Sequence, residues 1–310
     1  MNMPIVDIIL ATFNGESYID ALLDSIFNQT YIAWRLLIRD DCSSDATVTI
    51  IKSFADKYPE KIVVLDNKNI RLGVVGNFNA LLNKSSARYI MFADQDDIWL
   101  PHKIELTLSK AIESDNHDNV PLLVHTDLCV VDKNLIQLSK SFWSYQAIDP
   151  ARAVKLKDVM IQNVVTGCTM LINRSLAEIS MPIPSESKMH DWWIAMVASA
   201  FGKIEFIPES TILYRQHGKN DTGAKRWNLY NSFKYIFLGR KLHQRIIDTE
   251  NQALIFLRAY QDRLTNQQAV TLQMFGTLDE KNFFVRRFIA LGLGLRKHKI
   301  LRSIGLYVFM

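Results

Sequence analysis

The first hundred residues alternate between apolar segments of strand length and segments with helical periodicity, and this alternation limits the possible folds most. Strands are expected at residues 5–12, 34–39, 62–65 and 89–93. Between the first two, apolar residues recur at i, i+3, i+4, i+7 and i+8 from Ile19, which is one face of a helix. A strand–helix–strand rhythm of this kind predicts an α/β chain with a parallel sheet covered by helices.

Polar clusters follow three of these strands. They are Ala11-Thr12-Phe13-Asn14-Gly15 after the first strand, Arg39-Asp40-Asp41-Cys42-Ser43-Ser44-Asp45 after the second, and Asp94-Gln95-Asp96-Asp97 after the fourth. In open α/β sheets, ligands bind beyond the carboxyl ends of the strands. The clusters therefore mark the edge at which a ligand site is expected.

The first two clusters each allow a structural and a functional interpretation. Residues 11–15 have neither the glycines of a dinucleotide loop nor the Gly-Lys-Ser/Thr of a P-loop, so they form either a simple helix-entry turn or a contact to a base or ribose. Asp45 or the serines before it can cap the next helix. Capping alone does not require Asp40 and Asp41, whose carboxylates could accept hydrogen bonds from a nucleobase or ribose.

The third cluster favours a metal. Three carboxylates directly after a buried strand repel one another unless a cation lies among them. Oxygen ligands of this type suit Mg²⁺ or Mn²⁺, which often complete their coordination with substrate phosphates. An Asp-x-Asp sequence also occurs by chance in turns, so the position behind an apolar strand is what favours metal–phosphate binding.

The rest of the chain is mixed. We expect helices at 102–114 and 191–200, and strands at 122–131, 164–172, 203–207 and 211–215. From Trp227 onward only helical periodicity is present. These patterns predict a first domain over 1–225, followed by a helical region over 226–310.

Two further segments carry candidate residues. In His190-Asp191-Trp192-Trp193, the aromatic neighbours would partly desolvate Asp191 and raise its pKa toward the range of a general base; alternatively Asp191 is a helix N-cap. His217, in Tyr214-Arg215-Gln216-His217-Gly218, lies in an expected loop from which it could reach a metal, although a lone histidine is more often structural.

The last thirty residues differ from the rest in charge. Residues 281–310 contain seven Lys or Arg and no acid, so the net charge of +4 falls to −3 for residues 1–280. Apolar side chains interleave with these cations: Phe283, Phe284, Phe288, Ile289, Leu293, Ile300 and Leu306. This composition suits an anionic membrane surface, or else a helical subdomain with solvated cations. Nucleic acid fits less well, because the other part of the chain is acidic and no recognised motif is present.

Composition places the chain among globular proteins. Hydrophobic residues make up 48% and charged residues 22%, and no run of about 18 uncharged apolar residues occurs. Asp7 interrupts the N-terminal apolar stretch, which we interpret as a strand and not a signal peptide. Three distant cysteines, Cys42, Cys129 and Cys168, favour a reducing cytoplasm.

Taken together and in this order, the five motifs resemble glycosyltransferase family 2, the inverting enzymes of the GT-A fold. The resemblance covers about residues 4–220 and is nearest to bacterial rhamnosyl- and hexosyltransferases that build O-antigens and capsules. Cys42 departs from the pattern, since many relatives carry Gly or Asn there.

The resemblance implies that about residues 1–100 form the nucleotide-binding part of the first domain and residues 101–225 its acceptor-binding part. It also implies a role for each matching residue. Thr12 and Asn14 would line the nucleotide pocket, Asp41 would hydrogen-bond the pyrimidine, and Asp94 would contact the ribose or the metal shell. Asp96 would bind Mn²⁺ or Mg²⁺, with His217 as a further metal contact, and Asp191 would be the general base.

The predicted function is transfer of a sugar from a nucleotide-diphospho-sugar, dTDP-L-rhamnose or a UDP-hexose, to a hydroxyl of a growing, lipid-linked polysaccharide. The expected location is cytoplasmic, peripheral at the inner face of the cell membrane. Two alternatives compete with this prediction: a metal-dependent sugar nucleotidyltransferase, which would want a Gly-rich loop and an N-terminal Lys, and a non-catalytic glycan-binding module. A glycoside hydrolase would need neither a metal nor a nucleotide pocket.

Overall fold

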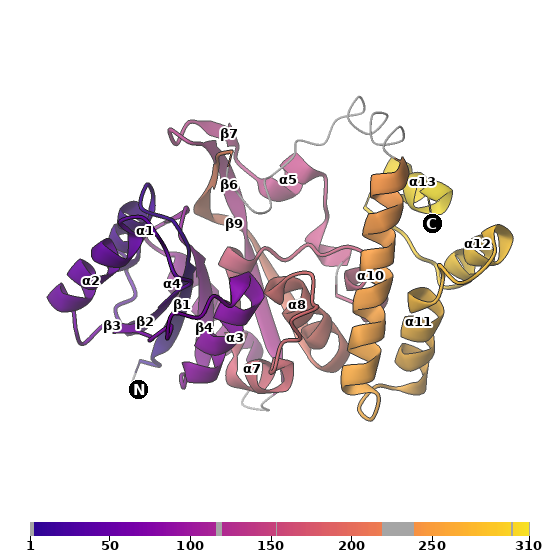
Figure 1. The fold of residues 1–310 in the computed structure, drawn as a ribbon, viewed down its shortest axis with the longest axis horizontal. Coiled ribbons are helices and arrows are strands. Elements are labelled where there is room, and N and C mark those ends of the chain that lie inside the picture. Colours follow the sequence, from indigo (N-terminus) through magenta and orange to yellow (C-terminus); the bar gives the residue numbers. More distant parts are fainter. Residues whose placement is uncertain (1–2, 116–119, 153, 219–238, 299, 310) are drawn as a thin grey trace. The chain divides into compact units, whose positions relative to one another are not determined.

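The computed structural model describes residues 3–115, 120–152, 154–218, 239–298 and 300–309 (Figure 1). Two compact units are present. Unit 1 holds the described residues of 1–142, 165–185 and 189–224, and unit 2 holds those of 143–164, 186–188 and 225–310. Unit 2 thus includes two short segments that the sequence pattern placed within the first domain.

Unit 1 is built on a mixed sheet of nine strands within the described residues. The strands are β1 (Val6–Thr12), β2 (Trp34–Asp40), β3 (Ile62–Val64), β4 (Tyr89–Asp94), β5 (Ile98–Trp99), β6 (Leu122–Asp132), β7 (Gln137–Ser139), β8 (Met170–Asn173) and β9 (Lys203–Gln216). Their order is β3-β2-β1-β4-β8-β6-β9-β5, with β7 paired to β6. The first four run parallel, as predicted, whereas β8 is antiparallel to both of its neighbours.

Helices pack against this sheet. They are α1 (Ile19–Phe27), α2 (Thr47–Lys57), α3 (Gly73–Lys84), α4 (Lys103–Asp115), α7 (Arg174–Ser180) and α8 (His190–Phe201). Four of the five apolar residues of α1 that recur at helical spacing are completely buried and the fifth, Phe27, is half-buried; Ile8, Ile9 and Leu10 of β1 are also completely buried. Burial of these stripes against the strands is the main favourable contribution to the folding of this unit.

Asp7 is the polar exception in the core of β1. Its side chain is completely buried and forms an ion pair of 3.0 Å with Arg35. The Ser85 hydroxyl and the backbone N–H groups of Ser86 and Ala87 also donate to it. Burial acts to raise its pKa, but the hydrogen bonds from Arg35 and Ser85 hold the pKa below its ordinary value. A charged residue is therefore compatible with this strand.

Two predicted strands differ from the observed ones. Residues 167–169 form a 3₁₀ turn, η2 (Gly167–Thr169), so the strand predicted at 164–172 begins only at Met170. The two short strands predicted at 203–207 and 211–215 are one strand, β9. Its register with β6 passes from Ile207 to Ser210 through an irregularity that accommodates Pro208.

Unit 2 is helical in the part that the structure describes. Its elements are α5 (Phe142–Gln146, from the second residue on), η1 (Pro150–Arg152), α6 (Leu156–Val159), α10 (Gly239–Tyr260), α11 (Asn266–Gly276), α12 (Phe283–Gly292) and α13 (Ile300–Phe309). A capping box of Thr265 and Gln268 starts α11, which packs closely on α10: a Cβ at Gly276 would lie 2.5 Å from Leu254 Cγ. Residues 226–238, 299 and 310 of the predicted helical region lie outside the described residues. None of the described helices is both long and apolar enough to cross a membrane.

Candidate active site

The carboxyl ends of β1, β2 and β4 meet at one edge of the sheet. In register, Thr12 of β1 lies opposite Asp40 of β2, and Ala11 lies opposite Asp94 of β4. The three polar clusters that follow these strands in the sequence are therefore neighbours in space, as predicted for parallel strands.

The residues at the ends of β1 and β2, which the sequence predicts to bind the nucleotide, are connected to one another by hydrogen bonds. The hydroxyl of Thr12, which is 2% exposed, donates to Asp40 Oδ2 at 2.9 Å. Asp40 also accepts the Ser43 backbone N–H at 2.7 Å. Asn14 is exposed, has a φ of 47°, and accepts the Ser44 backbone N–H at 2.9 Å. Of the two residues predicted to line the nucleotide pocket, only Asn14 is open to solvent.

Asp41 holds the start of α3. Its two oxygens accept the backbone N–H groups of Leu72, at 2.7 Å, and Gly73, at 2.9 Å, and Arg39 forms an ion pair with it at 3.2 Å. The residue is 3% exposed. Asp41 thus positions the 66–73 segment, which sequence reasoning missed.

The missed segment contributes one exposed side chain to this edge. The guanidinium of Arg71 lies 3.9 Å from the centre of the Phe13 ring. Gly73 has a φ of 68°, a backbone conformation that favours glycine. That glycine between an apolar strand and a helix is the sequence signal that could have drawn attention to the segment.

Gln95 links residues 94–97, here called the acidic motif, to the end of β1 by hydrogen bonds. Its Oε1 accepts the Phe13 backbone N–H and its Nε2 donates to the Phe13 carbonyl, both at 2.9 Å. A Cβ at Gly15 would lie 2.3 Å from Gln95 Oε1, so a larger residue at this position would displace the Gln95 amide. The residue between the aspartates is therefore a structural link.

Asp96 and His217 are brought together although 121 positions separate them. Asp96 Oδ2 and His217 Nε2 are 2.8 Å apart, and both side chains are largely buried. The His217 ring also stacks on Tyr18, with ring centres 4.7 Å apart. His217 directly follows the last residue of β9, so the length of this strand determines that the histidine lies next to the acidic motif.

Asp97, the last residue of the acidic motif, is completely buried. One oxygen accepts the Arg215 backbone N–H at 3.2 Å, whereas Oδ2 accepts no hydrogen bond of normal geometry from a described residue. Burial, reinforced by the charges of Asp96 and Asp94, raises its pKa well above the ordinary value. Side-chain ligand atoms of Asp94, Asp97 and Cys168 lie within 4.8 Å of one another.

Lys103 is a cation that the sequence did not single out. It is completely buried, its Nζ lies 4.6 Å from the centre of the Trp99 ring, and burial lowers its pKa to about 8. The nearby Cys168 and Asp97 act in the opposite direction. A positive charge in this place offsets part of the negative charge of the motif.

The donor set at this edge fits a divalent cation. Asp96 and His217 present an oxygen and a nitrogen 2.8 Å apart, and in the same motif Asp94 and Asp97, with Cys168, place ligand atoms within 4.8 Å of one another. Oxygen-rich sites with one imidazole are typical of Mg²⁺ and Mn²⁺.

Asp191 lies in the first turn of α8 and is partly accessible. Its oxygens accept the Trp192 backbone N–H at 2.5 Å and the Gly167 backbone N–H at 3.1 Å. Burial raises its pKa to about 6, against the lowering effect of these hydrogen bonds. The first turn of a helix also favours a negative charge there.

The turn η2 connects Asp191 with the acidic motif. Gly167 donates to Asp191, and the next residue, Cys168, lies beside Asp97. Consecutive Cα atoms are about 3.8 Å apart, so the two carboxylates flank the same short turn. Gly167 is closely confined, because a Cβ there would lie 2.9 Å from His190 Nε2. His190 is itself stacked on Phe78 at 3.9 Å.

A parallel α/β sheet extended by antiparallel strands, with an acidic motif behind its fourth strand, defines the GT-A class of glycosyltransferase folds. Two solved structures agree at this level. Residues 1–349 of S. aureus TarS, in complex with UDP-GlcNAc, have a TM-score of 0.54 at 15% identity, over 97% of this chain and 90% of that fragment. The mannosyltransferase PcManGT of Pyrobaculum calidifontis, in complex with GDP-Man and Mn²⁺, has a TM-score of 0.54 at 16% identity, over 99% and 85%.

The family follows from the sequence comparisons. Residues 7–179 match glycosyl transferase family 2. The dTDP-rhamnosyl transferase RfbG of Shigella flexneri is 30% identical over 241 residues, 74% of this chain and 78% of RfbG. The UDP-Glc:alpha-D-GlcNAc-diphosphoundecaprenol beta-1,3-glucosyltransferase WfgD of Escherichia coli is 37% identical over 110 residues, 36% of this chain and 42% of WfgD. The chain belongs to glycosyltransferase family 2 and is a glycosyltransferase.

Proposed function

We propose that this enzyme transfers a sugar from a nucleotide-diphospho-sugar to an acceptor hydroxyl, with inversion at the anomeric carbon and with Asp191 as the general base. The observation that carries the proposal is that Asp191, with a raised pKa, and the acidic motif of residues 94–97 flank the single turn η2. In a single displacement the base acts on the attacking hydroxyl while the leaving diphosphate is stabilised, so the base and the diphosphate-binding motif must lie close together.

Asp191 has the properties of a base for this step. A carboxylate with a pKa of about 6 is mostly ionised at neutral pH, yet it is a stronger base than an ordinary aspartate. It accepts the proton of the acceptor hydroxyl while that oxygen bonds to the anomeric carbon and the bond to the nucleoside diphosphate breaks. One displacement from the opposite face inverts the centre, and no second nucleophilic carboxylate is required.

Asp96 and His217 are the residues that would hold a divalent cation, Mn²⁺ or Mg²⁺, with Asp94 of the same motif as a further oxygen ligand. When bound, such an ion neutralises negative charge on the leaving diphosphate. The buried Lys103 places a positive charge near Asp97 of the same motif, and Gln95 keeps the motif attached to β1. Asn14 and the exposed Arg71 border the edge at which the nucleotide would lie.

The names of the relatives support the choice of donor and acceptor. RfbG is named a dTDP-rhamnosyl transferase, and WfgD is named for UDP-Glc and a diphosphoundecaprenol-linked sugar. The proposed donors are therefore dTDP-L-rhamnose or a UDP-hexose, and the proposed acceptor is a lipid-linked oligosaccharide of an O-antigen or capsule. Family membership sets aside the nucleotidyltransferase and the non-catalytic binding module.

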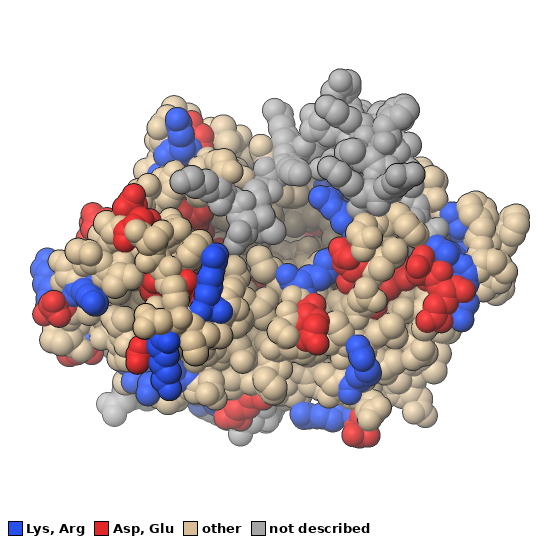
Figure 2. All heavy atoms as spheres, viewed as in Figure 1, with Lys and Arg blue, Asp and Glu red and all other residues tan. Residues whose placement is uncertain are grey.

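The C-terminal helices support a peripheral position at the inner face of the cell membrane. Phe284 and Phe288 of α12 are each 80% exposed, and Leu291, one turn further on, is 66% exposed. In Figure 2 the surface over α12 is mainly tan, the colour of residues other than Lys, Arg, Asp and Glu. Arg287 covers the Phe283 ring at 3.4 Å, so a cation borders the apolar stripe. Exposed aromatics beside arginines suit an anionic lipid surface.

A thermal-shift panel with UDP, dTDP, GDP, CDP and ADP, each with and without Mn²⁺, tests the donor class. A ligand at about 100 times its dissociation constant stabilises the folded protein by about 2.7 kcal/mol. We expect dTDP or UDP to act only with metal, and only on the wild type compared with Asp96→Ala. No shift with any nucleotide would contradict the proposal. The anomeric configuration of the product, measured by NMR, separates inversion from retention.

A further inference from the structure

Unit 2 contains a cavity of about 490 Å³ with an unusual charge, here called the basic pocket. It lies between the segment from η1 to α6 and the segment that follows α12. Its lining residues are Ala151, Arg152, Val154, Lys155, Lys157, Asp158, Gly294, Arg296, Lys297 and His298. Its volume is that of a small-molecule site and exceeds what a single ion needs.

Five cationic side chains and one carboxylate, Asp158, line the basic pocket. Arg152 pairs with Asp149 at 3.5 Å. The other four cations, Lys155, Lys157, Arg296 and Lys297, form no ion pair within 4.0 Å with any described carboxylate. Positive charge is therefore concentrated without a matching number of protein anions.

The fold holds two of these groups in place. Lys157 Nζ lies against the backbone of Gly294, 3.7 Å from where a Cβ would stand. Gly294 has a φ of 65°, so it turns the chain after α12 into the pocket wall. Lys297 follows in a protected position, where burial and then the charges of Lys188, Arg302 and Arg245 lower its pKa to about 8. Keeping that ammonium charged among other cations is unfavourable, and an anion would offset it.

His298 adds a neutral donor. Its Nδ1 accepts the Asp149 backbone N–H at 2.9 Å, so the uncharged ring carries its proton on Nε2. Arginine, lysine and imidazole N–H groups around one cavity are the donors that bind phosphate oxygens.

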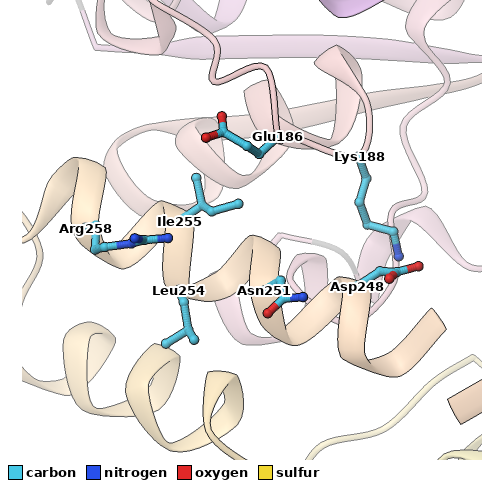
Figure 3. A pocket seen from close by; sticks show the side chains of 7 residues that line it. All are labelled: Glu186, Lys188, Asp248, Asn251, Leu254, Ile255 and Arg258. Atoms are coloured by element: carbon cyan, nitrogen blue, oxygen red, sulfur yellow. The ribbon is translucent and has the colours of Figure 1, made fainter. Parts of the chain in front are cut away.

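A second cavity of unit 2 shows the contrast. It measures about 520 Å³ and is lined by Glu186, Lys188, Asp248, Asn251, Leu254, Ile255 and Arg258 (Figure 3). Here two carboxylates balance two cations, and Lys188 and Asp248 point toward each other in Figure 3. The excess of positive charge is thus a property of the basic pocket and not of every hollow in this unit.

From this geometry we infer that the basic pocket binds a diphosphate group. The inference rests on the proposed function for the source of that group: it is the diphosphate that joins the acceptor glycan to its lipid. Net positive charge favours a multiply charged anion over a carboxylate, and Arg152 and Arg296 can each offer two parallel N–H groups to phosphate oxygens. A soluble diphosphate would satisfy the same chemistry, so the experiments separate the two sources.

Titration calorimetry of the full chain with sodium pyrophosphate tests the pocket itself. EDTA is present so that no divalent cation carries pyrophosphate to the acidic motif of unit 1. Lys155→Gln/Lys157→Gln is expected to weaken binding about tenfold or more. The control Lys52→Gln/Lys57→Gln removes the same charge from exposed positions of α2 and is expected to change the affinity by less than about twofold. Equal affinities in all three proteins, or equal weakening by both double variants, would overturn the inference.

Vesicle co-sedimentation identifies the source. Phosphatidylcholine vesicles carry either a polyprenyl diphosphate or phosphatidylglycerol at equal total charge. We expect wild type to prefer the diphosphate vesicles and the pocket variant to bind both kinds equally. If wild type shows no preference, the lipid-linked source is wrong, and the titration alone then decides for a soluble diphosphate.

Transfer to a short acceptor without lipid keeps this inference apart from the proposed function. The pocket variant is expected to retain that transfer while it loses the preference for diphosphate vesicles. Absence of transfer by wild type would contradict the proposed function without changing the pyrophosphate result. Loss of short-acceptor transfer in the pocket variant, with its melting temperature unchanged, would mean that the pocket serves the chemical step and would overturn its assignment to the acceptor diphosphate.

Discussion

The two units of this enzyme use charge in opposite ways. In unit 1 the acidic residues of the site are buried or largely buried, and most have defined hydrogen bonds, as Asp41 has with the start of α3. In unit 2 the cations surround an open pocket, and the apolar residues of α12 are exposed. The difference matches the proposed roles, in which unit 1 fixes the reacting groups and unit 2 binds a partner outside the chain. Substitutions in the two units should therefore have separable effects.

The largest effect is expected for Asp191→Asn, which removes the proposed base but keeps the shape of the side chain. The rate of transfer should fall by about 10²–10⁴-fold, the usual contribution of general base catalysis. In the wild type the rate should rise with pH through about 6, because the carboxylate must lose its proton before it can accept one from the acceptor. Steady-state rates between pH 5 and 8 measure both effects.

Stability provides the control for this variant. The folded pKa of Asp191 lies above its unfolded value, so the protein gains stability from this group at low pH and loses it as the pH rises through about 6. Asn has no such dependence. Urea unfolding at pH 7.5 should therefore show Asp191→Asn to be at least as stable as wild type, and its advantage should shrink toward pH 4. A variant that is unfolded at pH 7.5 would make its loss of activity uninformative about the base.

A smaller loss is expected when the metal residues are changed one at a time. Asp96→Ala should lower transfer by about 10²-fold or more, and His217→Ala by less, because the carboxylate supplies the charge that balances the cation. Excess EDTA should reduce the wild type to a similar level, and added Mn²⁺ should restore it. Activity that is indifferent to EDTA and to Asp96→Ala would contradict the metal role.

Gly167→Ala tests the link between the base and the acidic motif. The new Cβ would lie 2.9 Å from His190 Nε2, so the turn or the ring must move. We expect a loss of about 1–3 kcal/mol in the free energy of unfolding, together with a lower kcat as the Gly167 N–H shifts from Asp191. Gly292→Ala is the matched control, since nothing lies within 4 Å of its Cβ. If both substitutions change the free energy of unfolding and kcat equally, η2 does not link Asp191 to the acidic motif in the way proposed.

The smallest effect on chemistry is expected in unit 2. Phe284→Ser/Phe288→Ser removes two exposed aromatic rings from α12 and should lower binding to anionic vesicles by about tenfold, because less apolar surface enters the lipid. Transfer to a short acceptor without lipid should stay unchanged. If vesicle binding is unaltered, α12 does not contact the membrane.

Sequence patterns predicted the parallel half of the sheet well, because apolar strands and their polar ends are local features. β1, β2, β3 and β4 lie within one or two residues of the expected ranges. The antiparallel part was less predictable: β9 continues past Pro208 only because β6 tolerates an irregular register there. Local propensity in β9 contains no information about its partner β6, which lies about 80 residues earlier in the chain.

The site shows the same division. Asp94, Asp96 and Asp191 stand out by residue type and position, but the use of Asp41 by the start of α3 depends on where a later segment folds back. Lys103 is another example. A lysine at the start of an amphipathic helix gives no sequence signal that it is completely buried under an acidic motif. Such residues become visible only when the tertiary packing is known.

The register of β9 sets a limit on how relatives of this enzyme can vary in length. Side chains alternate between the two faces of a strand, so losing one residue between Leu213 and Gln216 would turn His217 away from Asp96 and displace the Arg215 N–H from Asp97. Insertions before Leu213 can be absorbed, because the pairing with β6 is irregular both between Ile207 and Ser210 and between Ser210 and Leu213. Natural length changes in this strand should therefore cluster before Leu213, and the four residues from Leu213 to Gln216 should form a segment of fixed count.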